Sequence, residues 1–332
     1  MYDQLETKSL PSADGSVSTA LREEATRASR KEPGRRGLLQ VLGLWFGISA
    51  AIGTTIAAGI VRTPGDIAQL LPDAFLFMAV WVVGGLYALC GASSLAELGA
   101  MIPRSGGQYN YSRRALGDYA GFIVGWSDWL SCCGTLAAVS IVVGEYSSKL
   151  LCLPSGMEKS VAIATILGFA LMNSQGIKSG NMAQLFTAAM KTIAFVILVL
   201  ACFFFSHPAM SEAAPSAGLT LSSGSAFFVN IILALQAVIY TIDGWNSVIY
   251  FGEEVKQPGR DVPRAIFGGV FTIMAIYLLL NASVLHVLPM NEIAGNKFCL
   301  GTVAQKIFGT YGDAVIRSIM VISLFSCINA TQ

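Results

Sequence analysis

Charged residues are scarce in this sequence. Only 12% of its 332 residues are Asp, Glu, Lys or Arg, and 54% are hydrophobic, whereas a soluble domain averages about 25% charged residues. This shortage excludes an ordinary soluble domain and indicates a membrane protein. The formal net charge is only +1, so the charge balance gives no reason to expect a nucleic-acid partner.

Side chains for metal binding or covalent catalysis are also few. The chain has two histidines and seven cysteines. The cysteines lie mostly in apolar runs without metal-site spacing, as expected for small hydrophobic side chains. Since no nucleophile–base pair or metal cluster appears within the apolar segments, we expect neither an enzyme nor a cofactor. The polar N-terminus also leads us to expect no cleavable signal peptide.

Long apolar runs, in contrast, are abundant. Residues 1–36 are rich in Ser, Ala, Glu and Arg and predict a disordered tail. Eight apolar segments follow, each near the roughly 20 residues that cross a bilayer, and they predict an all-α polytopic membrane protein. They lie at about 38–61 (with a second half-helix to 70), 75–101, 119–147, 160–176, 183–206, 226–253, 264–288 and 313–332.

The distribution of Lys and Arg predicts how these segments are oriented. With a cytoplasmic N-terminus, the tail and inner connections hold 14 of the 21 basic residues and the outer connections hold five. Membrane proteins show the same bias toward basic cytoplasmic loops. Without the tail the split is still seven to five. We therefore expect the tail, the 102–118 loop and the 254–264 loop to face the cytoplasm.

Small residues interrupt the first apolar segment. The stretch Gly47–Pro64 reads GISAAIGTTIAAGIVRTP, and Gly53, Thr54, Thr55 and Gly59 allow its backbone to leave helical geometry. A helix broken inside a membrane offers free amides at the start of one half and free carbonyls at the end of the other. These groups suit the carboxylate and the ammonium of a zwitterion. The alternative is a small-residue face for close helix packing, and this stretch alone leaves both open.

The sixth segment carries a second break signal. Residues 236–247 read QAVIYTIDGWNS, and Asp243 followed by Gly244 inside an apolar run marks an interruption. Segments one and six enter the membrane from opposite sides. Equivalent broken helices in oppositely oriented halves are typical of inverted-repeat transporters. We therefore predict a first five-helix repeat at 37–206 and an incomplete second repeat at 207–332.

Three motifs carry a resemblance to a known family. They are IAAGIVRTP at 56–64, AELGAMIPRSGGQYNY at 96–111, and DGW at 243–245 followed by EEVKQPGRDVPRAI at 253–266. In these motifs the sequence resembles the amino acid–polyamine–organocation superfamily of transporters, over about residues 38–332. The resemblance implies a LeuT-like inverted five-helix repeat with helices 1 and 6 broken. The resemblance also implies about twelve spans, so with eight found here we expect either a truncated product or an incomplete sequence.

The predicted substrate-binding residues lie at the two breaks, and the resemblance supports them. At the first break we expect the substrate carboxylate to bind amides near Ala58 and Gly59. At the second, Tyr240 is by resemblance an aromatic lid, or else a packed core tyrosine. Asp243 either binds the substrate ammonium or, as we favour, stabilises the break by local bonding. The full set is Ile56, Ala57, Ala58, Gly59, Tyr240, Thr241, Asp243 and Gly244.

Lys191 is the only lysine deep within a predicted span. A charge at the bilayer centre costs at least about 2.5–3.5 kcal/mol, so its presence favours a functional role. Burial disfavours the charged amine, which would allow Lys191 to exchange a proton. By resemblance, a lysine at this place substitutes for a sodium ion in proton-coupled members. The alternative is a structural lysine paired to backbone carbonyls. In the third segment, Asp128 and Glu145 are either proton relays or groups facing a wet interior.

These observations predict secondary active transport of amino acids by alternating access, with proton symport favoured. The expected partners are an amino acid, a proton and the lipid bilayer. The expected location is a plasma membrane or a bacterial inner membrane, with several passes and a cytoplasmic N-terminus. The alternatives are an amino acid exchanger, and a non-transporting fragment or amino-acid sensor. A channel is disfavoured because no continuous polar stripe runs along several spans.

Overall fold

The computed structural model describes residues 42–57, 59–154, 156–174, 177–205 and 224–331. The predicted tail at 1–36 and the predicted site residue Ala58 lie outside these ranges. Within them the chain is helical, and two isolated β-bridges are the only extended pairings. The elements are α2 (Leu44–Thr55), α3 (Gly59–Leu70), α4 (Ala74–Met101), α5 (Gln108–Leu116), α6 (Asp118–Leu150), α7 (Glu158–Ser174), α8 (Ile177–Phe205), α9 (Ser225–Ile242), η2 (Ser247–Tyr250), α10 (Pro258–Val287), α11 (Met290–Ile293), α12 (Cys299–Phe308), η3 (Gly309–Tyr311) and α13 (Gly312–Thr331).

The predicted all-α polytopic membrane fold is confirmed. Six helices of the described chain are long and apolar enough to cross a membrane, namely α4, α6, α8, α9, α10 and α13. The pair α2 and α3 is bent by 49° and counts as a seventh crossing if the two halves form one span. The predicted fourth segment is also helical as α7, but its 17 residues fall short of the roughly 20 that a crossing needs.

Helix boundaries follow ordinary capping chemistry where the sequence supplies it. The Asp73 side chain accepts a hydrogen bond from the Leu76 amide at 2.9 Å and caps α4. Pro258 begins α10, at a position where its missing N–H costs no helical hydrogen bond. Gly117, at φ 91°, separates α5 from α6, because a left-handed residue ends one helix and redirects the chain.

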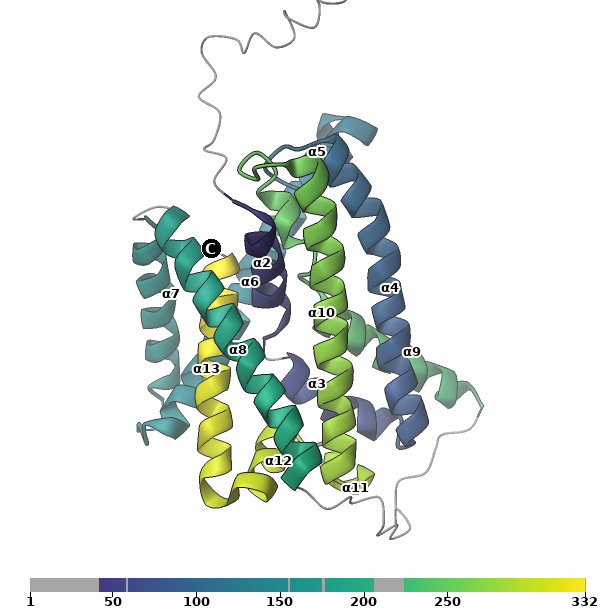
Figure 1. Cartoon of the computed structure of the whole chain (residues 1–332), viewed down its shortest axis with the longest axis vertical. Coiled ribbons are helices and arrows are strands. Elements are labelled where there is room, and N and C mark those ends of the chain that lie inside the picture. The colour runs from purple at the N-terminus through teal and green to yellow at the C-terminus, as the bar shows by residue number, and fades with distance from the viewer. Residues whose placement is uncertain (1–41, 58, 155, 175–176, 206–223, 332) are drawn as a thin grey trace, which may run out of the picture. The chain divides into compact units, whose positions relative to one another are not determined.

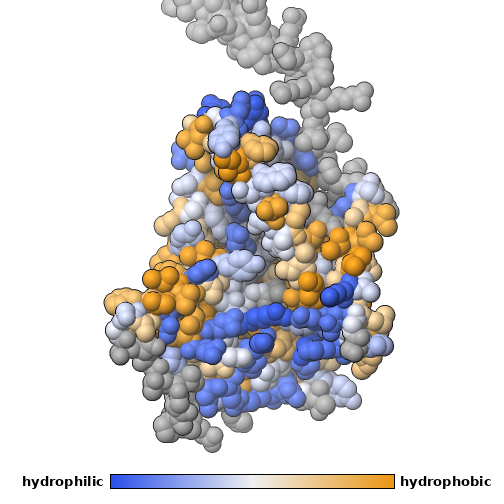
Figure 2. Space-filling model, turned by 180° about the vertical axis from the view of Figure 1, so that it is seen from behind, coloured by the Kyte–Doolittle hydropathy of each residue, from blue (hydrophilic) through white to orange (hydrophobic). Residues whose placement is uncertain are grey.

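Helix α10 lies against α2, α4 and α8, and α13 lies against α2, α6 and α8 (Figure 1). The second half of the broken pair, α3, contacts α9. The core between these helices holds large side chains that are almost fully buried. Trp81 of α4 and Tyr277 of α10 meet edge to face there, with ring centroids 5.7 Å apart. Figure 2 shows hydrophilic residues gathered toward the two ends of one face and hydrophobic residues mainly between them.

The segment before α2 and two of the connections meet at one end of the bundle. Leu42 exchanges backbone hydrogen bonds of 3.0 and 2.9 Å with Glu254 and Lys256. Ser105 pairs with Phe251 in an isolated bridge. The first described residue is thus tied to the 254–264 loop, and the 102–118 loop is tied to the residue that follows η2. That this end is the cytoplasmic one stays a prediction.

Candidate functional site

The break between α2 and α3 exposes carbonyl groups, and other helices supply donors to them. Helix α2 ends at Thr55, and Ile56 and Ala57 are not helical. The last four carbonyls of a helix lack helical partners. Here the carbonyls of Gly53, Thr54, Thr55 and Ile56 each lie within bonding distance of a side chain from α8, α10 or α13. The end of α2 is thus held by three helices at once.

Lys191 of α8 provides the positive charge at this break. Its side chain is fully buried, and its Nζ donates to the carbonyl oxygens of Gly53 and Ile56, at 3.1 Å each. Ser323 of α13 donates to the same Ile56 oxygen at 2.7 Å. No carboxylate in the described part of the chain pairs with Lys191. The partial negative charge at the C-terminus of α2 therefore balances the ammonium.

Tyr277 joins the first break to the second. Its hydroxyl lies 2.9 Å from the carbonyl oxygen of Thr55 and 3.2 Å from that of Thr241, at the end of α9. Two further contacts link the breaks directly. Thr54 donates through Oγ1 to the Gly244 carbonyl at 2.8 Å, and the hydroxyl oxygens of Thr63 and Thr241 are 2.7 Å apart. Two interruptions that lie far apart in the sequence thus form one polar region.

The small residues at the breaks permit these close approaches. A Cβ at Gly53 would lie 1.6 Å from Nε2 of Gln184, and a Cβ at Gly59 would lie 2.9 Å from Cγ2 of Thr241. Gly244 has φ +110°, which favours glycine, and its Cβ would lie 2.9 Å from Oγ1 of Thr54. Close packing therefore accounts for Gly53, Gly59 and Gly244. That the first amides of α3 bind a ligand stays a prediction.

The second break is not a pair of α-helical halves. Helix α9 ends at Ile242, a turn follows, and the chain continues as the four-residue 3-10 helix η2. Asp243 is the C-cap residue of α9, and its backbone N–H donates to the Ile239 carbonyl at 3.1 Å. That its carboxylate stabilises the break by local bonding stays a prediction.

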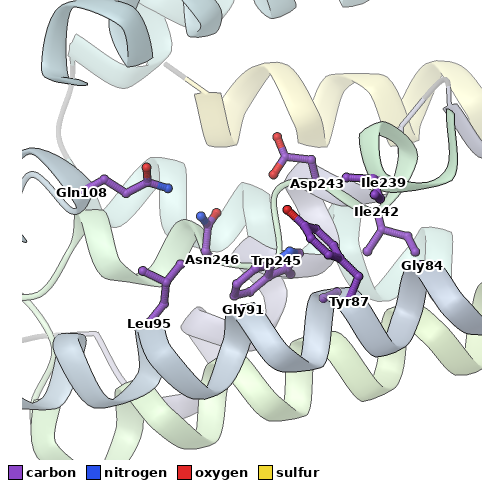
Figure 3. Close-up of a pocket in the computed structure, with 11 residues that line it drawn as sticks. Gly84, Tyr87, Gly91, Leu95, Gln108, Ile239, Ile242, Asp243, Trp245 and Asn246 are labelled. Atoms are coloured by element: carbon purple, nitrogen blue, oxygen red, sulfur yellow. The ribbon is translucent and has the colours of Figure 1, made fainter. Parts of the chain in front are cut away.

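A cavity of about 280 Å³ lies beside this turn, between α4, the start of α5 and the end of α9 (Figure 3). It is lined by Gly84, Tyr87, Ala88, Gly91, Leu95, Gln108, Ile239, Ile242, Asp243, Trp245 and Asn246. Tyr240 is not among these residues, and its side chain is 71% exposed. The alternative of a packed core tyrosine is therefore wrong for the described chain, whereas the predicted role of Tyr240 over the substrate stays a prediction. The structure also gives it no position over this cavity.

A second polar cluster lies where α3 meets α6. Arg62 of α3 forms an ion pair with Glu145 of α6 at 2.8 Å. Nearby, Arg317 of α13 pairs with Asp313 and lies 4.2 Å from the Phe298 ring centroid. Glu145 thus has a cationic partner, which the interpretation of it as a proton relay did not foresee. Arg62 lies in the first motif, two residues before Pro64. A charged residue at that place in the sequence was the available sign that an ion pair forms here.

Sequence reasoning did not find Tyr277, Ser323 or Thr63. Each lies in a helix that carries other polar residues as well, and the pattern also fits an ordinary buried hydroxyl. The signal that was available is the cost of a polar group in lipid, which makes each such group seek a partner. The partners themselves come from helices distant in the sequence.

The sequence is similar to those of several known proteins. It is 29% identical over 295 residues to the serine/threonine exchanger SteT of Bacillus subtilis, which covers 88% of this chain and 66% of that protein. It is 30% identical over 302 residues to the human b(0,+)-type amino acid transporter 1, with 89% of this chain and 59% of that protein covered. The human Asc-type amino acid transporter 1 is 27% identical over 307 residues, with coverage of 89% and 57%. The chain therefore spans about three-fifths to two-thirds of the length of these relatives.

All three relatives are named as exchangers or transporters, and none as an enzyme. The family model for amino acid permeases matches residues 37–331. This match takes in every described helix, including both breaks, Lys191 and the helices that supply Tyr277 and Ser323. Because it runs over nearly the whole sequence, the chain belongs to the amino acid permease family.

Proposed function

We propose that this chain forms the substrate-binding part of a secondary transporter that moves amino acids across a cell membrane by alternating access. One observation carries the proposal: the carbonyl end of α2 and the amide end of α3 meet at a break inside the bundle, with a buried ammonium against the carbonyls. Such a pair of helix ends provides opposite partial charges a few residues apart. That arrangement is complementary to a zwitterion.

The substrate carboxylate binds the free amides at the start of α3, around Gly59, where the helix dipole favours an anion. The substrate ammonium binds carbonyl oxygens at the end of α2 and near Thr241 and Gly244. The carbonyls of Thr55 and Ile56 already accept hydrogen bonds from side chains. A carbonyl oxygen has two lone pairs, and both are already used here: Thr55 accepts from Tyr277 and the Ala57 amide, and Ile56 accepts from Ser323 and Lys191. At these two carbonyls the substrate ammonium therefore has to replace one of the present donors. Serine and threonine are the first substrates to test, because one relative is named for them.

Lys191 provides the coupling in this proposal. In its charged form it holds α2 against α8 through the Gly53 and Ile56 carbonyls. Loss of its proton weakens both bonds, because a neutral amine is a poorer donor than an ammonium. The α2–α8 contact then loosens and favours opening toward one side. Proton symport results if this step accompanies each substrate movement. Exchange results if Lys191 stays charged throughout, as a fixed cation in place of a metal ion.

The chain is proposed to reside in a plasma membrane or a bacterial inner membrane, with its N-terminus in the cytoplasm. The basic-residue distribution supports this orientation. So does the meeting of Leu42, Ser105 and Glu254 at one end of the bundle.

Binding to the purified chain in lipid nanodiscs tests the proposal directly. Radiolabelled serine or threonine should bind saturably, and Gly59→Leu should abolish binding because its side chain covers the first amides of α3. Gly134→Leu is the matched control, since nothing lies within 4 Å of the Cβ position at Gly134. Equal binding by the Gly59→Leu variant and the unmodified chain would contradict the assignment of the site.

Counterflow in proteoliposomes separates transport from the alternatives. If the chain is a transporter, proteoliposomes that contain it and are loaded with unlabelled substrate should accumulate radiolabelled substrate from outside. Saturable binding without counterflow would identify a sensor or a non-transporting fragment. Counterflow without uptake driven by a proton gradient would identify an exchanger.

A further inference from the structure

We propose that Gln184 of α8 is a positioning residue that holds α2 against α8 and α13 at every pH, beside the contact that Lys191 makes in its charged form. The Gln184 side chain is 2% exposed and bonds to both neighbouring helices. Its Nε2 donates to the Ser49 carbonyl oxygen of α2 at 3.2 Å, and its Oε1 accepts from Nδ2 of Asn329 of α13 at 3.3 Å. The inference rests on the proposed function, because it concerns the same release of α2 from α8.

The contacts of Gln184 and Lys191 repeat along the two helices with the same spacing. Gln184 precedes Lys191 by seven residues in α8. In α2, Ser49 likewise precedes Ile56 by seven residues, and these two carbonyls accept from Gln184 and Lys191 respectively. Seven residues are close to two helical turns, so both side chains lie on one face of α8 and meet one face of α2. A shift of α2 along α8 would therefore break both contacts together.

The sequence of α2 leaves the space that this contact needs. Gly53 lies one turn after Ser49, and a Cβ at Gly53 would overlap Nε2 of Gln184. Glycine is unfavourable inside a helix, and a buried amide is costly unless it is hydrogen-bonded. The glycine thus permits two side chains of α8 to reach α2, since the Gly53 carbonyl itself accepts from Lys191.

The two contacts differ in their response to pH. Lys191 donates as an ammonium, whereas Gln184 and its two partners contain no ionisable group, and α2 contains no Asp, Glu, Lys, Arg or His. At the end of α2, the other titratable side chains that bond to its carbonyls are Cys327 of α13 and Tyr277 of α10. The charged and histidine residues of the helices packed against α8 lie in the first or last two turns of those helices, namely Glu158 and Lys159 on α7, Arg260, Asp261, Arg264 and His286 on α10, Lys306 on α12, and Asp313 and Arg317 on α13. The Gln184 contact therefore persists when Lys191 loses its proton.

Removing the Gln184 contact should shift the pH at which α2 is released. In the proposed mechanism, the closed arrangement holds a proton on Lys191 that the open arrangement has lost. A hydrogen bond of typical strength changes the ratio of closed to open molecules about fivefold. For a single proton, one pH unit corresponds to about tenfold, so loss of one such bond should lower the midpoint by about 0.7 unit. The midpoint falls because the weakened closed arrangement opens while more of the lysine is still charged.

Gln184→Met tests this expectation, because methionine has a similar length and lacks both the donor and the acceptor of the amide. Spin labels at Trp45→Cys on α2 and Met182→Cys on α8, both exposed positions, report the separation of the two helices across pH with no substrate present. The labelled chain carries serine at the four exposed native cysteines, Cys90, Cys132, Cys133 and Cys152. The midpoint of the distance change should be about 0.7 pH unit lower in the methionine variant.

Two further variants make the comparison specific. Thr192→Val is the matched control, since the Thr192 hydroxyl donates within α8, to the Ala188 carbonyl at 2.8 Å, and it should leave the midpoint unchanged. Asn329→Leu removes the donor to Gln184 and should lower the midpoint as well. Because both side chains act through one contact, the double variant of Gln184 and Asn329 should shift it by less than the sum of the single shifts.

Radiolabelled serine binding separates this proposal from the proposed function. If serine does not bind but Gln184→Met lowers the distance midpoint, the substrate assignment is refuted and the role of Gln184 stands. If the distance in the unmodified chain does not respond to pH, while Gln184→Met raises the open population about fivefold at every pH, the Lys191 coupling is refuted and the role of Gln184 stands.

Three results would overturn the proposal. The first is an unchanged or raised midpoint in Gln184→Met, and if that variant does not fold, the same result in Asn329→Leu decides. The second is an equal shift in Thr192→Val, which would show a general loosening of α8. The third is full additivity in the double variant, which would show that Gln184 and Asn329 act separately.

Discussion

Replacing Lys191 by methionine tests the coupling proposal most directly. Methionine keeps most of the aliphatic length of lysine and removes the ammonium, so the α2–α8 packing is retained. Two hydrogen bonds of 3.1 Å are lost. The Ile56 carbonyl keeps Ser323 as a donor at 2.7 Å. The Gly53 carbonyl loses the only side-chain donor that it has among the described residues.

The expected cost in stability comes from the Gly53 carbonyl, which is left without a side-chain donor. An unsatisfied buried carbonyl costs about 1–3 kcal/mol, and removing a buried charge relieves part of this cost because the charge is no longer desolvated. We expect a net destabilisation of about 1–2 kcal/mol, small enough for the variant to remain folded. Thermal unfolding in detergent measures it. Lys191→Ala should cost more, because it also leaves a cavity where the fully buried stem was.

The functional effect should be larger and of a different kind. If Lys191 couples transport as proposed, rising pH removes the proton that holds α2 to α8 in the unmodified chain, and substrate binding and uptake should depend on pH. The methionine variant has no group to titrate at this place, and its pH profile should be flat. Radiolabelled serine binding across pH, and uptake into proteoliposomes with an imposed proton gradient, both report this. An unchanged profile, or undiminished uphill uptake, would make Lys191 structural and leave Asp128 and Glu145 as the next candidates.

Three further predictions concern the rest of the bundle. Burial raises the pKa of the Glu254 carboxyl, so between its unfolded and folded pKa the native state holds a proton that the unfolded chain has lost. Stability should therefore fall as pH rises through that interval, and Glu254→Gln should flatten the unfolding curve against pH. Gly53→Ala should abolish folding into a monodisperse species, because its Cβ would lie 1.6 Å from Gln184 Nε2; adding Gln184→Ala should restore the elution profile, and failure to do so would refute the packing explanation. A membrane-impermeant thiol reagent applied from outside the cell should label Lys159→Cys and not Lys178→Cys; the reverse pattern would overturn the proposed orientation.

The sequence was sufficient to locate the helices and the breaks. Each apolar run became a helix, because in lipid a helix satisfies every backbone group locally. The bounds were less accurate: α8 and α10 each begin six residues before the predicted start, and α9 ends at Ile242, eleven residues before the predicted end at 253. Lys191 was found for the same reason, since a single charge in an apolar run is conspicuous. The 3-10 geometry of η2 was not found, because the Asp243-Gly244 signal marks an interruption and does not specify the backbone conformation of the next residues.

The partners of the free carbonyls could not be read from the sequence. Tyr277 and Ser323 reach the end of α2 from helices more than 200 positions away in the chain, and helix periodicity does not fix which faces meet at such separations. The exposure of Tyr240 could not be read from the sequence for a related reason. Its side chain is exposed in the described chain, while its role over the substrate stays a prediction. Rotation about a helix axis depends on tertiary packing, which a single sequence constrains weakly.

The Tyr277 hydroxyl has a mechanical consequence. It has one proton and two carbonyl oxygens within reach, at 2.9 Å on Thr55 and 3.2 Å on Thr241. Only one of them can receive a full hydrogen bond at any moment, so the two half-broken helices compete for a single donor. A shift of α9 relative to α2 by a few tenths of an ångström would reverse which of them holds it. Since a typical hydrogen bond contributes about 1 kcal/mol, and the one lost is replaced by the one gained, the two arrangements differ little in free energy. For this one hydroxyl, a change of partner between Thr55 and Thr241 would therefore cost little free energy.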